Sequence, residues 1–324
     1  MPTLPKISVN IPIKPESDIK TVISSLKKIK YPPEQTEIII VEGNQIARQR
    51  NLALKKSKGE IIYLLDNDSA VKSTAFEIIA SEFKKSAVAA VGGPSLTKKD
   101  KNSLSFVIAC ALETYFGAMR MRLRYSSQKM AEAGSEYHLI GANLALRKKI
   151  VKKLGGFNEK IMPNEETELL RRIKKAGYKL VYKKELSIYR QQRKSIWDLA
   201  NQFHHYGIGR MKQIVYNGSF EDVIFFVPII FVLYLFSLLF YDPVWYSAPL
   251  LLYLGLSFAT SLKATLKYKQ FGLLFTLPLI FPVIHISYAL GLQHEIIRRI
   301  FLKKQSETRQ PKLKVKTLYL QDLS

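Results

Sequence analysis

The sequence predicts an α/β domain with a mostly parallel sheet and flanking helices, followed by a helical transmembrane region. Three observations indicate this organisation. Apolar, β-prone runs alternate with helical patterns near the N-terminus, two carboxylates directly follow one of these runs, and three long apolar runs come after Asp222. Strands that alternate with helices form parallel sheets, because each helix carries the chain back to the same edge of the sheet. A chain of 324 residues is long enough for both parts.

The N-terminal part has the pattern strand, helix, strand, helix, strand. Runs rich in isoleucine, valine and leucine predict buried strands at residues 7–13, 37–41 and 61–65. Helical patterns extend from about residue 18 to 28 and from 45 to 56, and Tyr31-Pro32-Pro33 marks a turn before the second strand. This arrangement is typical of one half of a doubly wound sheet.

Asp66 and Asp68 follow the third expected strand, with Asn67 between them. Ligands of open α/β sheets bind just beyond the carboxyl ends of the strands, so both carboxylates should face a ligand. Mg²⁺ and Mn²⁺ take one or two protein carboxylates and complete their shell with water and substrate phosphates. The pattern therefore indicates a metal and diphosphate site, with helix capping by these carboxylates as the alternative.

The second part of the chain is far more apolar than the first. Residues 1–218 mix charged and apolar side chains as soluble domains do, whereas the runs 223–241, 243–262 and 271–292 contain no Asp, Glu, Lys or Arg. A hydrocarbon core of about 30 Å requires roughly 20 apolar residues per helix. We therefore expect residues 219–304 to form transmembrane or re-entrant helices, and the polar, basic residues 305–324 to be a disordered tail.

Basic residues flank the apolar runs. Lys263, Lys267 and Lys269 lie between the second and third runs, and the third is followed by Arg298, Arg299, Lys303, Lys304, Arg309, Lys312, Lys314 and Lys316. With a net charge of +24, these clusters are typical of segments held at an anionic cytoplasmic leaflet. Three complete spans would place the basic tail on the far side of the membrane. We therefore expect Pro278 and Pro282 to break the third run into a re-entrant hairpin.

The location of the N-terminal domain is expected to be cytoplasmic, at the cell membrane, because no signal-peptide pattern precedes the first strand. The single cysteine, Cys110, excludes a disulfide within the chain. A basic protein can bind nucleic acid, but the sequence has no zinc pattern, RNA-binding signature or helix-turn-helix arrangement. Nucleic acid is therefore not an expected partner.

Residues 104–124 are predicted to form one amphipathic helix in the membrane interface. The stretch is apolar but contains Glu113 and several arginines, which is too much charge for a span. Its arginines Arg120, Arg122 and Arg124 would contact lipid headgroups, and its aromatic residues Phe106, Tyr115 and Phe116 would face acyl chains. A core helix packed on the sheet is an equally compatible alternative.

Several motifs, in their order and spacing, resemble glycosyltransferase family 2, whose members are inverting nucleotide-sugar enzymes with a GT-A fold. The matching segments are residues 7–14, 37–44, 47–51, 58–68, 140–147, 155–159, 164–172, 189–195 and 202–210. The last two are similar to a membrane-attached subset that includes the succinoglycan-type exopolysaccharide glucosyltransferases. The resemblance covers residues 7 to about 216 and implies a Rossmann-like GT-A catalytic domain at residues 1–218.

The resemblance also implies roles for individual residues. Asp68 and Asp66 would bind Mg²⁺ or Mn²⁺, and Glu166, which stands where the family usually has an aspartate, would be the general base. The nucleotide-sugar donor would contact Pro12, Ile13, Glu42, Arg48, Asp66, Asn67, Arg190 and Arg193. Asn143 and Glu165 would lie on the acceptor side, and Glu165, about 100° from Glu166 on a helix, would face solvent or cap the turn.

The function expected from these features is an inverting, metal-dependent glycosyltransferase. It would move a sugar from a UDP- or GDP-sugar to a membrane-associated, polyprenyl-(di)phosphate-linked glycan during assembly of a cell-surface polysaccharide or glycoprotein glycan. Three apolar runs are too few to enclose a polymer channel, which favours a single addition. Two alternatives are a polyprenyl-phosphate sugar synthase, whose acceptor is the lipid phosphate itself, and a non-catalytic membrane scaffold with a degenerate GT-A domain.

Overall fold

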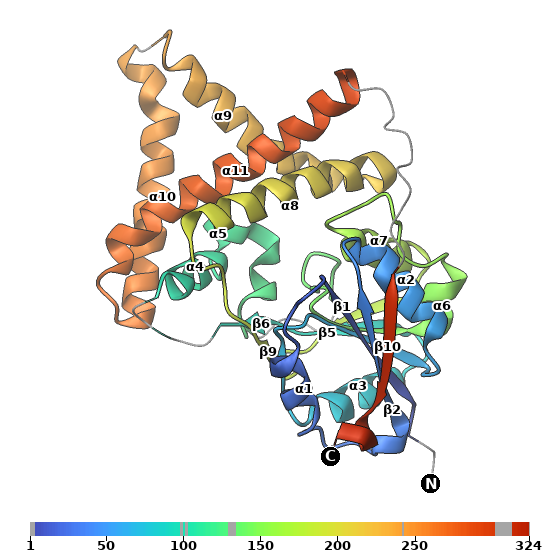
Figure 1. The fold of residues 1–324 in the computed structure, drawn as a ribbon. Helices are drawn as coiled ribbons and strands as arrows, with labels where there is room; N and C mark the ends of the chain where they lie inside the picture. Colours follow the sequence, from blue (N-terminus) through green and yellow to red (C-terminus); the bar gives the residue numbers. More distant parts are fainter. Residues whose placement is uncertain are drawn as a thin grey trace. The chain divides into compact units, whose positions relative to one another are not determined.

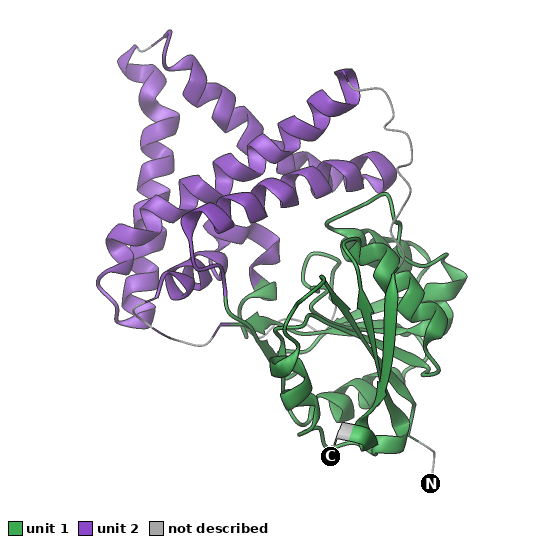
Figure 2. Ribbon diagram, viewed as in Figure 1, with its two compact units in different colours: residues 1–96, 123–191, 307–324 green, residues 97–122, 192–306 purple. Residues whose placement is uncertain are grey.

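The computed structural model describes residues 4–97, 100, 103–128, 134–241, 243–301 and 313–323. The chain forms two compact units, shown in separate colours in Figure 2. Unit 1 comprises residues 1–96, 123–191 and 307–324, and unit 2 comprises residues 97–122 and 192–306. This division differs from the domain boundary expected at residue 218, because the helix that contains residues 196–217 packs along a hydrophobic helix of unit 2.

Unit 1 is built on a seven-stranded sheet with the strand order β10-β2-β1-β3-β7-β5-β8 (Figure 1). The strands are β1 (Ile7–Ile13), β2 (Thr36–Glu42), β3 (Ile61–Leu65), β5 (Val88–Gly92), β7 (Asn143–Arg147), β8 (Lys179–Tyr182) and β10 (Lys314–Tyr319). β1 is parallel to both β2 and β3, whereas β7 is antiparallel to β3 and β5. The predicted α/β class and the first three strands are confirmed.

Helices cover both faces of this sheet, and the side chains of β3 alternate between them. Ile61, Tyr63 and Leu65 belong to one core cluster, which also holds apolar residues of α1 (Lys20–Leu26) and α3 (Ala75–Phe83). Ile62 and Leu64 belong to a second cluster with residues of α2 (Ile46–Lys56), α6 (Lys148–Lys153) and α7 (Glu165–Lys175). A strand buried on both faces needs an unbroken apolar run, and β3 has one.

A smaller three-stranded sheet lies in the same unit. It has the order β4-β9-β6 and consists of β4 (Ala70–Val71), β6 (Ser95–Leu96) and β9 (Ile188–Tyr189). β9 pairs antiparallel with β4, which follows the two carboxylates closely in sequence, and parallel with β6. The pairing of β4 with β9 brings residue 190 back to the end of β3.

The expectation of a disordered tail is wrong for residues 314–319. These residues form β10, which pairs antiparallel with β2 from Lys314 opposite Glu42 to Tyr319 opposite Glu37. Leu318 packs against the core cluster of β1 and β3. Without β10, β2 would be an edge strand with unpaired backbone groups, so the added strand satisfies hydrogen bonds as well as burying apolar surface. Residues 305–312 and 324 of the expected tail lie outside the described residues.

Unit 2 is helical. Its α-helices are α4 (Leu104–Leu112), α5 (Tyr115–Ala118), α8 (Ile196–Asn217), α9 (Val227–Ser237), α10 (Ala248–Tyr268) and α11 (Leu273–Phe301). α8 and α11 pack closely along each other (Figure 1). A Cβ atom added to Gly207 of α8 would lie 2.2 Å from the Tyr288 carbonyl oxygen, and one on Gly291 of α11 would lie 2.0 Å from the His204 carbonyl oxygen. Only glycine permits this backbone approach.

The three apolar runs are confirmed as helical segments long and apolar enough to cross a membrane. These segments are Phe220–Ser237, Val244–Tyr268 and Leu273–Phe301. The expected break at Pro278 and Pro282 is absent, because both prolines lie inside the continuous helix α11. Each proline removes one backbone donor, which a helix tolerates where neighbouring helices pack on it, as α5, α9 and α10 pack on α11.

The single interfacial helix expected at residues 104–124 is also wrong. α4 and the following helical turns, Tyr115–Arg124, meet at an angle of 84°. Glu113 is the C-cap of the first helix, and Thr114 caps the second, because its Oγ1 accepts a hydrogen bond of 2.9 Å from the Gly117 backbone amide. Phe106 is buried, and the ring of Phe116 packs on Phe281, so of the three aromatic residues only Tyr115 is exposed.

Candidate active site

Asp66 and Asp68 both bind one cation, the guanidinium group of Arg190. The Arg190 Nη1 lies 2.9 Å from Asp66 Oδ2, and its Nε and Nη2 lie 2.7 and 3.2 Å from the two Asp68 oxygens. The backbone amide of Arg190 donates to the Leu96 carbonyl, which fixes the end of β9. The carboxylates are partly exposed, at 29% for Asp66 and 46% for Asp68. They therefore form an accessible, negatively charged pair that converges on one positive charge.

This donor set fits a divalent metal ion that a substrate helps to bind. No group of three or more His, Cys, Asp or Glu side chains that could hold a metal is found among the described residues. Two carboxylate oxygen donors suit Mg²⁺ or Mn²⁺ when water and diphosphate supply the remaining ligands. The observed contact with Arg190 shows that both carboxylates can bind the same cation at once.

The ends of β1 and β2 lie next to each other at the same edge of the sheet. The Ile13 carbonyl accepts hydrogen bonds from the Gly43 amide and from Gln49 Nε2, at 2.9 and 2.8 Å. Glu42, the last residue of β2, forms an ion pair of 3.1 Å with Lys314 of β10. These contacts hold the expected donor-binding residues Ile13 and Glu42 at one edge.

Other expected donor-binding residues have mixed surroundings. Pro12 is buried in β1, and Arg48 on α2 is half-buried. Asn67 donates a hydrogen bond of 2.8 Å to the Asp18 carbonyl, so its side chain also ties the turn after β3 to the start of α1. Arg193 belongs to unit 2, where its Nε donates to Gln202 Oε1 at 3.1 Å.

Glu165 is the first residue of α7 and is buried in unit 1. Its Oε1 lies 2.5 Å from Arg50 Nη1, and both side chains are at most 4% exposed. Arg50 Nη2 also donates to the Gly141 carbonyl. Burial raises the pKa of the Glu165 carboxyl to about 7, although the nearby Arg50 acts in the opposite direction. Glu165 therefore does not face solvent, which was one of the two environments expected for it, and its place at the start of α7 leaves the other, a cap of the turn, open.

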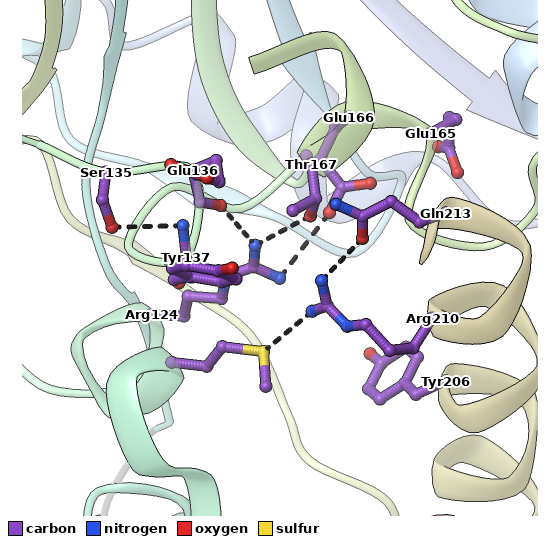
Figure 3. A network of polar contacts seen from close by, with 12 residues as sticks. Arg124, Ser135, Glu136, Tyr137, Glu165, Glu166, Thr167, Tyr206, Arg210 and Gln213 are labelled. Atoms are coloured by element: carbon purple, nitrogen blue, oxygen red, sulfur yellow. Dashed lines mark hydrogen bonds and ion pairs between the residues drawn. The ribbon is translucent and has the colours of Figure 1, made fainter. Parts of the chain in front are cut away.

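Glu166 lies beside a different arginine. Arg124 Nη1 is 3.7 Å from Glu166 Oε1, and Arg124 Nη2 donates to Thr167 Oγ1 at 3.0 Å (Figure 3). The guanidinium also donates to the Tyr137 and Glu136 carbonyls, at 2.8 and 3.0 Å. Arg124 is 6% exposed, so the expectation that it contacts lipid headgroups is wrong. Its hydrogen bond to Thr167 instead fixes the start of α7. The ion pair between Glu166 and Arg124 is longer than the one between Glu165 and Arg50.

Asn143 does not line an open acceptor surface. Its side chain has no exposed area, and its Nδ2 donates to the Leu186 carbonyl at 2.6 Å while its Oδ1 accepts from the Tyr63 hydroxyl at 2.7 Å. These contacts join β3, β7 and the loop before β9. The prediction for Asn143 is therefore wrong, and the residue supports the sheet from within.

The sequence did not predict the carboxylate partners of three residues of this region: Arg50, Arg124 and Lys314. Each binds a carboxylate from another part of the chain, at Glu165, Glu166 and Glu42 respectively. Arg50 lies in a segment that resembles the family, and this was the available signal for it. Arg124 and Lys314 carry no local pattern that points to their partners.

Comparison with known sequences links this geometry to an enzyme family. The sequence profile described as glycosyl transferase family group 2 matches residues 61–292, a range that includes Asp66, Asp68, Glu166 and Arg190. The chain is also similar to the probable glycosyltransferase YdaM of Bacillus subtilis (strain 168). The two are 26% identical over 213 residues, which cover 55% of this chain and 49% of the relative. The chain therefore spans about half the length of that curated relative.

Comparison with one solved structure confirms the fold class. The mannosyltransferase PcManGT from Pyrobaculum calidifontis, in complex with GDP-Man and Mn²⁺, matches with a TM-score of 0.54 at 15% sequence identity, over 94% of this chain and 89% of that chain. Residues 1–349 of S. aureus TarS in complex with UDP match with a TM-score of 0.44 at 14% identity, over 96% of each chain. The likeness to the mannosyltransferase supports a GT-A fold for this chain.

Proposed function

Since the chain belongs to glycosyl transferase family group 2, we propose that it transfers a sugar from a UDP- or GDP-sugar to an acceptor hydroxyl, with inversion at the anomeric carbon. Membership of the family makes it a transferase, so the scaffold alternative falls away. The observation that carries the proposed chemistry is the convergence of Asp66 and Asp68 on one cation at the carboxyl end of β3. The diphosphate of a nucleotide sugar needs a cation at its binding site, and these two carboxylates can hold one.

The leaving group gains negative charge as the glycosidic bond breaks. Asp66 and Asp68 would hold Mg²⁺ or Mn²⁺, which when bound supplies positive charge to the departing diphosphate. Arg190 is placed to exchange its carboxylate contacts for phosphate oxygens, because a guanidinium group binds phosphate in the same bidentate way as carboxylate. Glu42 and the end of β1 would hold the nucleoside part of the donor. Arg48, Asn67 and Arg193 stay assigned to donor binding as proposals.

Glu166 would accept the proton from the attacking acceptor hydroxyl, at a carboxylate oxygen. A comparison of Glu166 with Glu165 supports this assignment. Glu165 is held by Arg50 at 2.5 Å and is 3% exposed, whereas Glu166 is 3.7 Å from Arg124 and 8% exposed. Glu166 can therefore meet a substrate at a smaller cost in broken contacts. Arg124 would keep this carboxylate oriented until the acceptor arrives.

The acceptor is proposed to be a glycan linked to a polyprenyl (di)phosphate, at the cytoplasmic face of the cell membrane. Three helical segments long and apolar enough to cross a membrane support a lipid-linked acceptor, because a membrane-bound enzyme meets such a substrate at high local concentration. The resulting product would serve cell-surface polysaccharide or glycoprotein glycan assembly. If lipid phosphate itself were the acceptor, a general base would have little to do.

The test is a transfer screen with the full-length protein, UDP- and GDP-sugars, and Mg²⁺ or Mn²⁺. Polyprenyl-diphosphate glycans, polyprenyl phosphate and soluble glycans are compared as acceptors. Asp68→Ala should lower turnover by about 10² to 10³ because it removes a preorganised charge at the leaving group. Glu77→Ala, which removes an exposed carboxylate from α3, is the matched control and should leave turnover unchanged. Near wild-type turnover of Asp68→Ala in metal-replete buffer would refute the assignment.

A further inference from the structure

The two parts of the chain that border α4 and α5 belong to the same sheets. β3, which precedes these helices in sequence, pairs with β7, which follows them, from Ile61 opposite Arg147 to Leu65 opposite Asn143. β6 likewise pairs with β9. Strands that share backbone hydrogen bonds lie on one side of a bilayer, because an open sheet cannot continue through hydrocarbon. Residues 97–122 therefore leave and return on the same side.

This connection determines whether the bent pair, α4 with Tyr115–Arg124, crosses the membrane. By length and composition, α4 with Tyr115–Arg124 could be a broken span or a re-entrant loop. A single span would separate β3 from β7. The pair must therefore be re-entrant or interfacial, in agreement with the 84° bend between its halves.

The same reasoning applies to the segment between β9 and β10. β9 ends at Tyr189, and β10 begins at Lys314 and pairs with β2 in the main sheet of unit 1. Both ends of the intervening chain thus lie on the side of the membrane that holds the sheet. The segments Phe220–Ser237, Val244–Tyr268 and Leu273–Phe301 cannot all cross, because the number of crossings between β9 and β10 must be even.

The positions of the basic residues indicate which two of these three segments cross the membrane. Lys263 and Lys267 lie in the last two turns of α10, and Lys269 is its C-cap, at the connection to α11. If α11 crossed with either α9 or α10, this connection would lie on the side opposite to the sheet. If α9 and α10 cross together, the lysines lie on the same side as the sheet and as the basic residues after α11, in keeping with the retention of Lys and Arg on the cytoplasmic side.

The exposure of apolar side chains also indicates that α9 and α10 are the pair that crosses. Buried residues make up 11% of the best apolar window of Phe220–Ser237 and 17% of that of Val244–Tyr268, but 39% for Leu273–Phe301. α11 contacts α4, α5, α8, α9 and α10, so it is the central helix of unit 2. α9 and α10 instead expose large apolar side chains, among them Ile230 at 65% and Leu252 at 64%. Side chains of this kind need lipid around them.

The connection between α9 and α10 carries a cluster of aromatic residues. Rings of Tyr241, Trp245 and Tyr246 are in mutual contact, with centroids between 5.1 and 6.1 Å apart. Trp245 is 68% exposed and Tyr241 is 52% exposed. Tyrosine and tryptophan gather at membrane–water interfaces, where an apolar ring and a polar edge are both satisfied. The cluster suits the far interface of a bilayer.

We propose that α9 and α10 form the one hairpin that crosses the bilayer, and that α4, α5, α8 and α11 lie in the near leaflet without crossing it. The strand β10 returns the chain to the sheet after α11 and so fixes its end on the catalytic side. The partner is an anionic leaflet on that side, which the lysines at the C-terminal end of α10 match in charge.

The test is the accessibility of single cysteines in the full-length chain, in a Cys110→Ala background. Val244→Cys probes the aromatic tip, Gly272→Cys the connection before α11, Asp322→Cys the segment after β10 and Lys84→Cys the sheet-bearing unit. All four positions are exposed, and a side chain at residue 272 would meet no atom within 4 Å. A membrane-impermeant maleimide is added to spheroplasts and to inverted membrane vesicles of a bacterial host.

We expect Val244→Cys to react only in spheroplasts and the other three variants only in inverted vesicles. Reaction of Gly272→Cys or Asp322→Cys in spheroplasts would overturn the proposal. So would a Val244→Cys variant that reacts in inverted vesicles or on neither side. The labelling pattern needs no enzyme activity, so its outcome is separate from that of the transfer screen.

Discussion

Glu165 and Arg50 form an ion pair of 2.5 Å in which neither side chain is more than 4% exposed. The pair joins the start of α7 to α2, and the same guanidinium lies over the Phe157 ring, 5.7 Å from its centroid. A buried carboxylate with one strong partner supports the local structure at a cost in desolvation. Glu165 could therefore act as the general base in place of Glu166 only if its ion pair with Arg50 were broken.

The titration of Glu165 should make the stability of the protein depend on pH. Burial raises the pKa of this carboxyl from 4.5 to about 7. Between these pH values the native state binds more protons than the unfolded chain, so the free energy of unfolding decreases as pH rises. We expect the wild type to lose stability relative to Glu165→Gln across this interval, measured by thermal unfolding in detergent. A relative gain would show that the Arg50 pair outweighs burial.

Replacement of the two neighbouring glutamates should separate their roles. Glu166→Gln keeps the size of the side chain but cannot accept a proton, so transfer to a hydroxyl acceptor should decrease by roughly 10² or more with donor binding nearly unchanged. Glu165→Gln is the matched control and should reduce transfer much less. Both rates are measured side by side with the same acceptor. The reverse order would move the general base to Glu165, and an unaffected Glu166→Gln would favour lipid phosphate as the acceptor.

Local pattern was enough to predict the start of the fold. β1 and β3 are unbroken apolar runs, and Asp66 and Asp68 directly follow β3, so the sequence alone places two carboxylates at an edge of the sheet. The contact of these carboxylates with Arg190 depends on the pairing of β9 with β4, which joins residues more than a hundred positions apart. The residue was predicted for this site, but not its bond to both aspartates.

Partners that come from distant segments could not be predicted in this way. β10 has the sequence Lys-Val-Lys-Thr-Leu-Tyr, whose alternation is that of an edge strand, but its charge and its position after a basic segment suggested disorder. Arg124 lies in a run of arginines that resembles a headgroup-binding surface, yet it is buried against Thr167 and the carbonyls of residues 136 and 137. In both cases the tertiary partner, not the local pattern, decides the conformation.

The pairing of β10 with β2 can be tested by a disulfide. Lys314 is directly opposite Glu42, so cysteines at both positions should form a bond under mild oxidation. The matched control combines Glu42→Cys with Val315→Cys, because neighbouring residues of a strand point to opposite faces. Both pairs are made in a Cys110→Ala background and followed by gel mobility without reductant. Equal crosslinking of the two pairs, or none in the first, would contradict the register.

Arg190 should oppose metal binding in the absence of donor and support donor binding in its presence. It contacts Asp66 and Asp68 at 2.9 and 2.7 Å, so a metal ion that binds these carboxylates has to displace it. Arg190→Met should therefore tighten Mn²⁺ binding measured by calorimetry without nucleotide. The same variant should raise the KM for the donor by about tenfold or more, since a charge-assisted contact to phosphate contributes about 1.5 to 3 kcal/mol.

Lys72→Met is the matched control for this prediction, because Lys72 is an exposed cation that follows β4 directly and donates to the Glu185 carbonyl rather than to the two aspartates. It should change neither Mn²⁺ binding nor the KM for the donor. Two shifts in opposite directions distinguish exchange of Arg190 between carboxylates and phosphate from a purely structural contact, whose loss would weaken both kinds of binding together. Weaker Mn²⁺ binding by Arg190→Met would therefore show that the arginine orders the aspartates instead of competing for them.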